Sequence, residues 1–241
     1  ISAINFDLMH GLPGQSVVDL TETIAQALLL KPDRVAVFGY AHMPSAIPRQ
    51  RMIADLDLPG PAARFGMMTA AHRLFTAAGY VAIGFDHFAR AEDSLAQAAA
   101  AGALIRNFQG YATHAGNALI GLGATAISQF PGLIVQNEKH LGQWEAAANA
   151  SRLSGARGVQ VSDDDARRAD IIARLLCDGM VDVPEPLSDA MPQLARHAAR
   201  GLVQLHGRQV ALTADGWPYA RLIASAFDAH GHKAQRHSKA V

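Results

Sequence analysis

Short apolar runs alternate with longer helical patterns over the first part of the chain. Ile4–Met9 and Arg34–Tyr40 are apolar runs of strand length, and between them Ser16 followed by Asp19 forms a capping box that predicts a helix through Leu30. A strand, helix, strand unit of this length implies parallel pairing and a right-handed crossover. The sequence therefore predicts an α/β fold.

The same alternation continues along the chain. The pattern predicts a second helix over 62–78, a third strand over 80–85 and an alanine-rich helix over 93–103. Residues 106–111 follow as a polar and aromatic loop, and a glycine-rich segment comes at 121–124.

The last third of the chain has a different character. Three acids at 163–165 begin a helix that runs to about Cys177, at the end where the helix dipole favours negative charge. A helix over 194–200, a small hairpin within 201–212 and a helix after a Thr213 cap follow. This order of elements is typical of a winged-helix-like domain.

A domain boundary is predicted between Gly155 and Ser162. It separates a first domain, residues 1–155, from a mainly α-helical, winged-helix-like C-terminal domain, residues 156–241. Because the chain starts at Ile1 in what looks like the middle of a strand, we expect it to be a piece of a longer polypeptide.

The composition excludes several classes of protein. The 241 residues carry 21 basic and 21 acidic side chains, and 50% of them are hydrophobic, which is enough for a core. Zero formal net charge argues against electrostatic binding of nucleic acid, and no apolar run is long enough to span a bilayer. A single cysteine excludes a disulfide framework within the chain. We expect a soluble, cytoplasmic and monomeric protein without a nucleic-acid or membrane partner.

Polar side chains follow three of the predicted strands. Asp7 and His10 lie at the end of the first, His42 follows the second, and Asp86 and His87 follow the third. Because α/β folds place their chemistry at the carboxyl ends of strands, Asp7, His42 and His87 could bind a divalent metal and form a metal-dependent hydrolase. The alternative is that each side chain caps a loop or satisfies a buried carbonyl.

Four further places in the chain carry side chains or glycines that could serve a function. The glycines of 121–124 allow close approach of a ligand or simply tight packing. The loop 106–111, with a guanidinium, two amides and two aromatic rings, favours a binding role. The tail histidines His230, His232 and His237, with Lys233 and Arg236, could form a metal site, although a solvated C-terminus is the simpler interpretation. Cys177 is expected to be an inert core residue.

Several motifs together resemble one family. They occur in this order: NFDL at 5–8, GLPGQ at 11–15, PDR at 32–34, FGYAH at 38–42, GY at 79–80, IGFDHFA at 83–89, RNFQGY at 106–111, GLG at 121–123, AIS at 126–128, QN at 136–137 and DD-x-RR at 164–168. Over nearly its whole length the chain resembles the oxygen-independent coproporphyrinogen III oxidases (dehydrogenases), radical S-adenosylmethionine (SAM) enzymes of haem biosynthesis. It resembles the related haem chaperones less, because they differ at 86–89 and lack the 107–111 run.

The resemblance implies that the chain is the C-terminal portion of such an enzyme. It would contain the last strands of a partial (β/α)6 radical SAM barrel, followed by the C-terminal domain. The family's Cys-x-x-x-Cys-x-x-Cys loop, which holds a [4Fe–4S] cluster, is absent from this sequence. One cysteine cannot hold that cluster, so we expect the chain alone to be inactive.

The reaction that the resemblance implies belongs to the intact enzyme. A 5′-deoxyadenosyl radical, made from SAM with the help of an electron donor, would start the oxidative decarboxylation of two propionate side chains of coproporphyrinogen III. The products would be two vinyl groups and protoporphyrinogen IX, as in anaerobic haem biosynthesis.

Three site residues are carried over from the resemblance. Asp7, Ala41 and Ile127 match family positions that contact SAM. No catalytic residue is assigned, and no metal ligand is expected in the chain. His10 stands where the family commonly has tyrosine, and the stretch 184–191 looks shortened.

A second group belongs to the loop 106–111. Phe108 and Gln109 match a segment that lies near SAM and substrate in the family, and Arg106 is a candidate partner of a substrate propionate on charge grounds. The alternatives left open are a haem-binding, chaperone-like relative, the metal-dependent hydrolase of Asp7, His42 and His87, and a winged-helix nucleic-acid binder.

Overall fold

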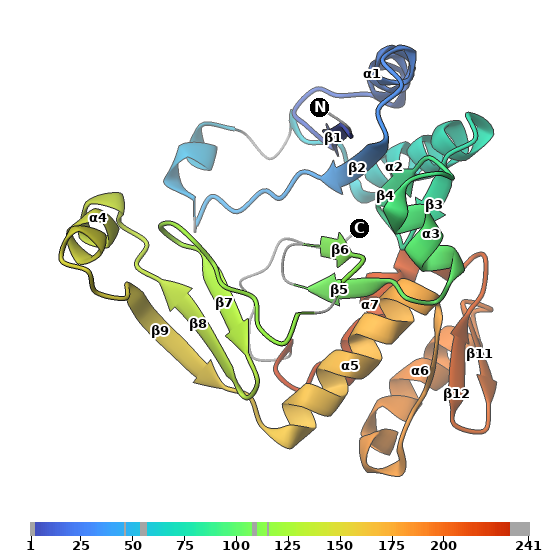
Figure 1. The fold of residues 1–241 in the computed structure, drawn as a ribbon. Helices are drawn as coiled ribbons and strands as arrows, with labels where there is room; N and C mark the ends of the chain where they lie inside the picture. The colour runs from blue at the N-terminus through green and yellow to red at the C-terminus, as the bar shows by residue number, and fades with distance from the viewer. Residues whose placement is uncertain (1–2, 46, 54–56, 108–109, 115, 232–241) are drawn as a thin grey trace.

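The fold is known from a computed structural model, which describes residues 3–45, 47–53, 57–107, 110–114 and 116–231 (Figure 1). It is a mixed α/β fold, and the strands within these described ranges form four separate sheets. No helix among the described residues is long and apolar enough to cross a membrane.

The main sheet has the strand order β1-β2-β4-β3. Its strands are β1 (Asn5–His10), β2 (Arg34–Gly39), β3 (Val81–Ile83) and β4 (His87–Ala89). The predicted strand, helix, strand unit is confirmed: β1 and β2 pair in parallel, and α1 (Val17–Leu29) between them starts with the capping box of Ser16 and Asp19. The helix α2 (Pro61–Ala77) follows, after a short 3-10 helix η1 (Pro48–Met52).

The third predicted strand needs a correction. Strand β3 ends at Ile83, Asp86 lies in a turn, and His87 begins β4, which runs back antiparallel to both β3 and β2. Asp86 and His87 are therefore not at the carboxyl end of a parallel strand. The reversal occurs at Gly84, whose φ of +60° is unfavourable for other residues.

The two faces of the main sheet have different surroundings. One face packs against α1 and α2 in a core of Leu20, Ile24, Val35, Val37, Met67, Ala71, Phe75, Tyr80 and Phe88. Since neighbouring residues of a strand point to opposite faces, the other face carries Asp7, Met9, Phe38 and His87. We call it the Asp7 face.

A hairpin replaces the predicted loop at 106–111. Its strands are β5 (Ile105–Asn107) and β6 (Gly110–Ala112), and it follows α3 (Ser94–Ala100), which ends three residues before the predicted end. Asp93 caps α3 by accepting a hydrogen bond from the Leu95 N–H and also forms an ion pair with Arg34.

The next sheet has no counterpart in the predicted elements. It has the antiparallel order β7-β8-β9, with β7 (Ile127–Phe130), β8 (Leu133–Asn137) and β9 (Gly155–Gln160), and α4 (Leu141–Asn149) lies between β8 and β9 in sequence. In Figure 1 this sheet lies apart from the main sheet, with the loop after β2 reaching toward it.

The last third has its own core. The helix α5 (Asp163–Asp178) is confirmed, with a capping box of Ser162 and Asp165 and a left-handed Gly179 at its end. After it come β10 (Met180–Asp182), η3 (Glu185–Ala190), α6 (Met191–Ala198), β11 (Val203–His206), β12 (Gln209–Leu212), η4 (Trp217–Tyr219), α7 (Ala220–Ala224) and η5 (Ser225–Phe227). The predicted helix, hairpin, helix order is present, but β10 joins the hairpin in an antiparallel sheet of order β10-β12-β11, so this part is less purely helical than expected.

Candidate functional site

Asp7 lies in a row of residues that crosses the main sheet. It is paired with Ala36 of β2, and Ala36 is paired with His87 of β4, so the three share the Asp7 face. The Asp7 side chain is exposed and accepts a hydrogen bond of 2.8 Å from Asn5 Nδ2. Ala36, whose side chain is a single methyl group, stands between Asp7 and His87 in this row.

His10 lies on the opposite face from Asp7. It is 4% exposed and packs beside Gly39. Burial lowers the pKa of His10 to about 4, and the charge of Arg64 acts in the same direction. The predicted grouping of Asp7 with His10 at one strand end is therefore wrong, because alternation along β1 separates them.

The metal-site interpretation finds no support in the described part of the chain. Within it, no group of three His, Cys, Asp or Glu side chains is placed to hold a metal ion. His42 lies in the loop after β2, with its ring 6.0 Å from that of Tyr40, while His87 starts β4.

Asp86 and His87 form a close pair. Asp86 Oδ1 lies 2.5 Å from His87 Nδ1, and the side chains are 14% and 17% exposed respectively. The imidazole ring makes edge contacts with Phe38 at 5.7 Å and with Tyr111 at 5.2 Å between centroids. The sequence analysis named both residues, but as possible metal ligands at a strand end.

Tyr111 connects this region to α5 and packs against the turn at Gly84. Its hydroxyl donates a hydrogen bond of 3.2 Å to the Leu176 carbonyl of α5, and burial raises the pKa of Tyr111. The ring lies so close to Gly84 that a Cβ there would be 1.8 Å from the Tyr111 hydroxyl oxygen. Gly84 thus serves both the turn and the packing of Tyr111.

Arg106 packs between two aromatic rings. Its guanidinium carbon lies 4.7 Å from the ring centre of Tyr111 and 5.2 Å from that of Phe85. Its Nη1 is buried without a hydrogen-bond partner in the described residues. The neighbouring candidates Phe108 and Gln109 lie outside the described residues.

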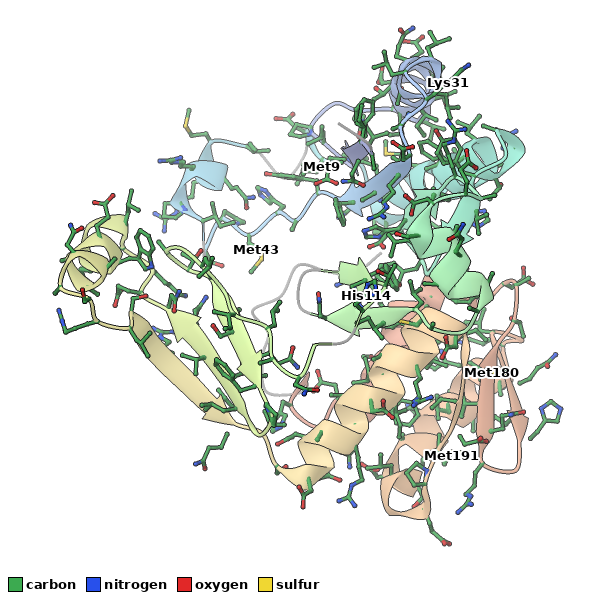
Figure 2. The ribbon with its side chains drawn as sticks, in the orientation of Figure 1. Met9, Lys31, Met43, His114, Met180 and Met191 are labelled. Atoms are coloured by element: carbon green, nitrogen blue, oxygen red, sulfur yellow. The ribbon has the colours of Figure 1, made fainter. Side chains whose placement is uncertain are left out.

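Two residues that the sequence analysis missed hold the loop that contains Ala41. Gln50 Nε2 donates to the Ala41 carbonyl, and Gln50 Oε1 accepts from the Met43 N–H. Arg64 Nη2 donates to the Tyr40 carbonyl at 2.8 Å. Ala41 is exposed, and Figure 2 marks Met43 in the same loop and Met9 at the end of β1.

Ile127 begins β7, and the glycine-rich segment packs against it. A Cβ at Gly121 would lie 2.6 Å from the Ile127 carbonyl oxygen. Asn137 Nδ2 donates to the carbonyls of Gly121 and Gly123, at 3.1 and 2.9 Å. Tight packing therefore explains Gly121.

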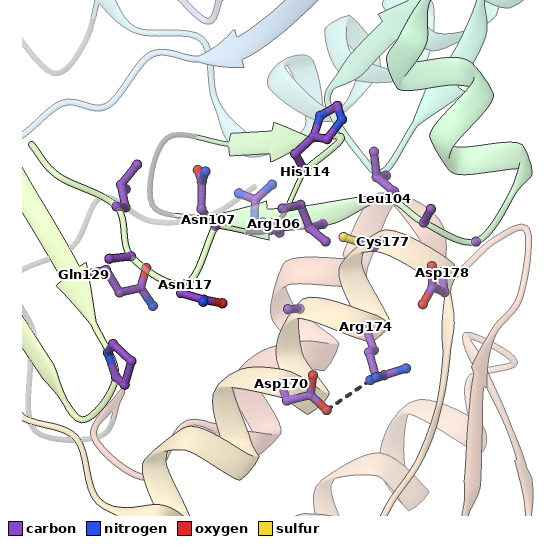
Figure 3. A pocket seen from close by; sticks show the side chains of 18 of the residues that line it. Leu104, Arg106, Asn107, His114, Asn117, Gln129, Asp170, Arg174, Cys177 and Asp178 are labelled. Carbon is purple, nitrogen blue, oxygen red and sulfur yellow. Dashed lines mark hydrogen bonds and ion pairs between the residues drawn. The ribbon is translucent and has the colours of Figure 1, made fainter.

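A cavity of about 570 Å³ lies between β5, β7 and α5 (Figure 3). Arg106, Asn107 and Gln129 line one side, and Cys177 with the Asp170–Arg174 ion pair of 3.0 Å lines the other. Burial raises the pKa of Cys177 to about 11, so its thiol stays protonated at neutral pH. With one protonated cysteine in the whole chain, these residues do not fit a [4Fe–4S] cluster.

The histidine tail is described only in part. His230 Nε2 lies 2.8 Å from Asp165 Oδ1, at the start of α5. The other members of the proposed tail site lie outside the described residues: His232, Lys233, Arg236 and His237.

The chain is similar along its whole length to named enzymes. It is 43% identical to the oxygen-independent coproporphyrinogen III oxidase of Bradyrhizobium diazoefficiens, with all of this chain and 56% of that protein aligned. It is 36% identical to the oxygen-independent coproporphyrinogen III oxidase of Pseudomonas aeruginosa, with 94% of this chain and 52% of that protein aligned. No family model matches the chain.

A solved structure has the same fold. It is described as coproporphyrinogen III oxidase (HemN) from Escherichia coli, a radical SAM enzyme, and it matches with a TM-score of 0.88 and 34% identity over 95% of this chain and 55% of that one. The chain is thus a homologue of oxygen-independent coproporphyrinogen III oxidases, corresponds to their C-terminal part and spans about half their length.

Proposed function

We propose that this chain is the C-terminal part of an oxygen-independent coproporphyrinogen III dehydrogenase that acts in anaerobic haem biosynthesis. The observation that carries the proposal is the similarity along the whole chain, at 43% identity to one such enzyme, together with the shared fold. The complete protein would convert two propionate side chains of coproporphyrinogen III into vinyl groups, with loss of two CO2. Each propionate would give up one hydrogen atom to the SAM-derived radical and one electron to an acceptor.

The cluster and the chemistry of SAM activation come from outside this chain. A bound [4Fe–4S] cluster with SAM supplies a radical able to remove hydrogen from an unactivated carbon. Since Cys177 is a single, protonated and half-buried thiol, the cluster ligands must lie in the half of the enzyme that this chain does not span. On its own the chain is therefore proposed to be inactive.

This chain would bind SAM through three positions. Asp7 would offer its carboxylate to the ribose hydroxyls or the ammonium group of SAM, Ala41 would contact it from the loop after β2, and Ile127 would pack against the adenine. The exposure of Asp7, on the sheet face opposite the core formed with α1 and α2, supports this assignment. Gln50 would act as a positioning residue, because it holds the backbone on both sides of Ala41 and His42.

The substrate would be bound by the neighbouring hairpin. We propose Phe108 and Gln109 as contacts to SAM or substrate and Arg106 as the partner of a propionate. The buried, unpartnered Nη1 of Arg106 supports the last assignment, since a buried guanidinium N–H without an acceptor is costly unless a ligand supplies one.

The remaining assignments concern the domains, the oligomeric state, the location and the electron donor. We propose that residues 1–155 contain the last strands of a partial (β/α)6 barrel and that residues 156–241 form a winged-helix-like domain. The complete protein is proposed to be a cytoplasmic monomer that needs an electron donor.

An Asp7→Ala variant tests the SAM site. In a polypeptide that contains this chain and the cluster-binding half, losing a charged hydrogen-bond acceptor should weaken SAM binding about tenfold or more. The measurement is SAM affinity by isothermal titration calorimetry under anaerobic conditions. Glu22→Ala, at an exposed position of α1 behind the opposite face, is the matched control. Equal SAM affinity in Asp7→Ala and Glu22→Ala would refute the assignment.

A further inference from the structure

We propose that His87, held in place by Asp86, is a substrate-binding residue that donates a hydrogen bond from Nε2 to a substrate carboxylate on the Asp7 face. The inference rests on the proposed function, which makes this carboxylate one of the two porphyrinogen propionates that would be decarboxylated. It assigns a role to a pair of residues for which the SAM site has no use.

The hydrogen bond within the pair decides which nitrogen is available. Nδ1 of His87 is bonded to Asp86 Oδ1 at 2.5 Å, so Nε2 is the nitrogen left for a ligand. With Asp86 accepting from the Nδ1 proton, Nε2 donates to a ligand when it also carries a proton. Asp86 is then a positioning residue, because it acts through His87.

Two aromatic rings hold the His87 ring in one orientation, and its side chain keeps 17% of its surface exposed. Phe38 and Tyr111 contact the ring edge-on, with interplanar angles of 82° and 81°. A Cβ at Gly110, in β6 of the hairpin, would lie 3.8 Å from Nε2. A side chain at this position would therefore lie against this nitrogen.

The location fits a ligand that also reaches SAM. Asp7 and His87 stand in one row across the sheet with Ala36 between them, which places their strands two spacings, about 10 Å, apart. A ligand lying over Ala36 could contact both. On our assignment the propionate bound by His87 would therefore lie beside the SAM bound by Asp7.

Charged groups of both signs lie near His87. They include Asp86 in its own turn, Arg106 on the adjoining hairpin and Asp7 across the sheet. Asp86 is hydrogen-bonded to Nδ1, and Arg106 places a cation near the Tyr111 ring, which His87 also contacts. A carboxylate that reaches both His87 and Arg106 would thus meet two hydrogen-bond donors.

Porphyrin binding tests the inference with a matched pair of ligands. Coproporphyrin III is the oxidised, fluorescent form of the proposed substrate, and deuteroporphyrin IX has hydrogen in place of the two propionates that would be decarboxylated. We would titrate both into the 241-residue chain and record fluorescence. His87→Asn keeps an amide donor for Asp86 near the place of Nδ1 and removes Nε2.

We expect His87→Asn to bind coproporphyrin III about tenfold or more weakly than the wild type and to bind deuteroporphyrin IX unchanged. His72→Asn is the control, because His72 also makes an edge contact with a ring, that of Phe88, on the opposite side of the sheet. His87→Phe, which keeps the ring contacts with Phe38 and Tyr111, replaces His87→Asn if the latter does not fold.

The outcomes separate this inference from the proposed function. If the wild type binds neither porphyrin, the proposed substrate site on this chain fails and the inference fails with it. If it binds coproporphyrin III and the His87 variants bind it equally well, the inference is overturned while the proposed function stands. An equal loss of affinity for both porphyrins would show a structural role and would also overturn it.

Discussion

The Tyr111 ring can occupy its position only because Gly84 has no side chain. Gly84→Ala should therefore lower the free energy of unfolding. The residue has a φ of +60°, and a Cβ there would lie 1.8 Å from the Tyr111 hydroxyl oxygen and 2.2 Å from the ring carbon that bears it. These atoms belong to a ring held by its hydrogen bond to Leu176, so the ring has to move.

The expected loss in the free energy of unfolding has two contributions, one from the backbone and one from Tyr111. The left-handed backbone alone costs an alanine about 1 kcal/mol. Moving Tyr111 breaks its hydrogen bond to Leu176 and its contact with Arg106, each of which contributes about 1 kcal/mol. We expect Gly84→Ala to lower the free energy of unfolding by about 3 kcal/mol.

Gly79→Ala separates the two parts. Gly79 has a φ of +87° and nothing within 4 Å of its would-be Cβ, so alanine there should cost only the backbone contribution, about 1 kcal/mol. Urea denaturation followed by circular dichroism measures both variants. In a Tyr111→Ala background, Gly84→Ala should cost no more than Gly79→Ala. Equal losses for the two glycine variants in the wild-type background would refute the argument.

Three further predictions follow from single contacts. Asn137→Ala frees the carbonyls of Gly121 and Gly123 and should lower the free energy of unfolding by about 1–2 kcal/mol, measured by urea denaturation; no loss would contradict the role of Asn137. The pKa of His10 is about 4 in the folded state and 6.5 in the unfolded state, so His10 does not destabilise the fold above about pH 6.5. As the pH falls to 4, up to about 3 kcal/mol of the free energy of unfolding is lost, because the unfolded state binds the proton more readily. The free energies of unfolding at pH 7 and pH 4.5 should therefore differ less in His10→Leu than in the wild type. Ser162→Ala removes the capping box of α5 and should cost about 1 kcal/mol, seen as a lower midpoint of thermal unfolding; an unchanged midpoint would argue against the cap.

Local signals made part of the fold predictable. The β1-α1-β2 unit and α5 carry their own periodicity and capping boxes, so their ends follow from residues within the element. Strands β3 and β4 have three residues each, too few to show an alternation, so the sequence pattern predicts a single strand through the turn between them. Every residue of β9 is exposed, so β9 lacks the buried and exposed alternation that marks a strand.

The candidate site was predictable only where it depends on side chains of known chemistry. Asp7 and the Asp86–His87 pair were identified from the sequence, but their common row depends on the pairing of β2 with β4. Gln50 and Arg64 act on backbone carbonyls far away in sequence, and such contacts leave no pattern in the chain. Asp7, Ala41, Ile127, Arg106, Phe108 and Gln109 stay predictions until binding is measured.

The most direct test of the central claim is an anaerobic assay of a hybrid enzyme. The N-terminal half of the Bradyrhizobium diazoefficiens relative, joined to this chain, would supply the missing half. With SAM, a reductant, an electron acceptor and coproporphyrinogen III, we expect protoporphyrinogen IX together with two molecules of 5′-deoxyadenosine per product. At a SAM concentration near the Kd of the unsubstituted hybrid, we expect less of both from the Asp7→Ala hybrid. A hybrid that holds its cluster and cleaves SAM but leaves coproporphyrinogen III unchanged would contradict the account.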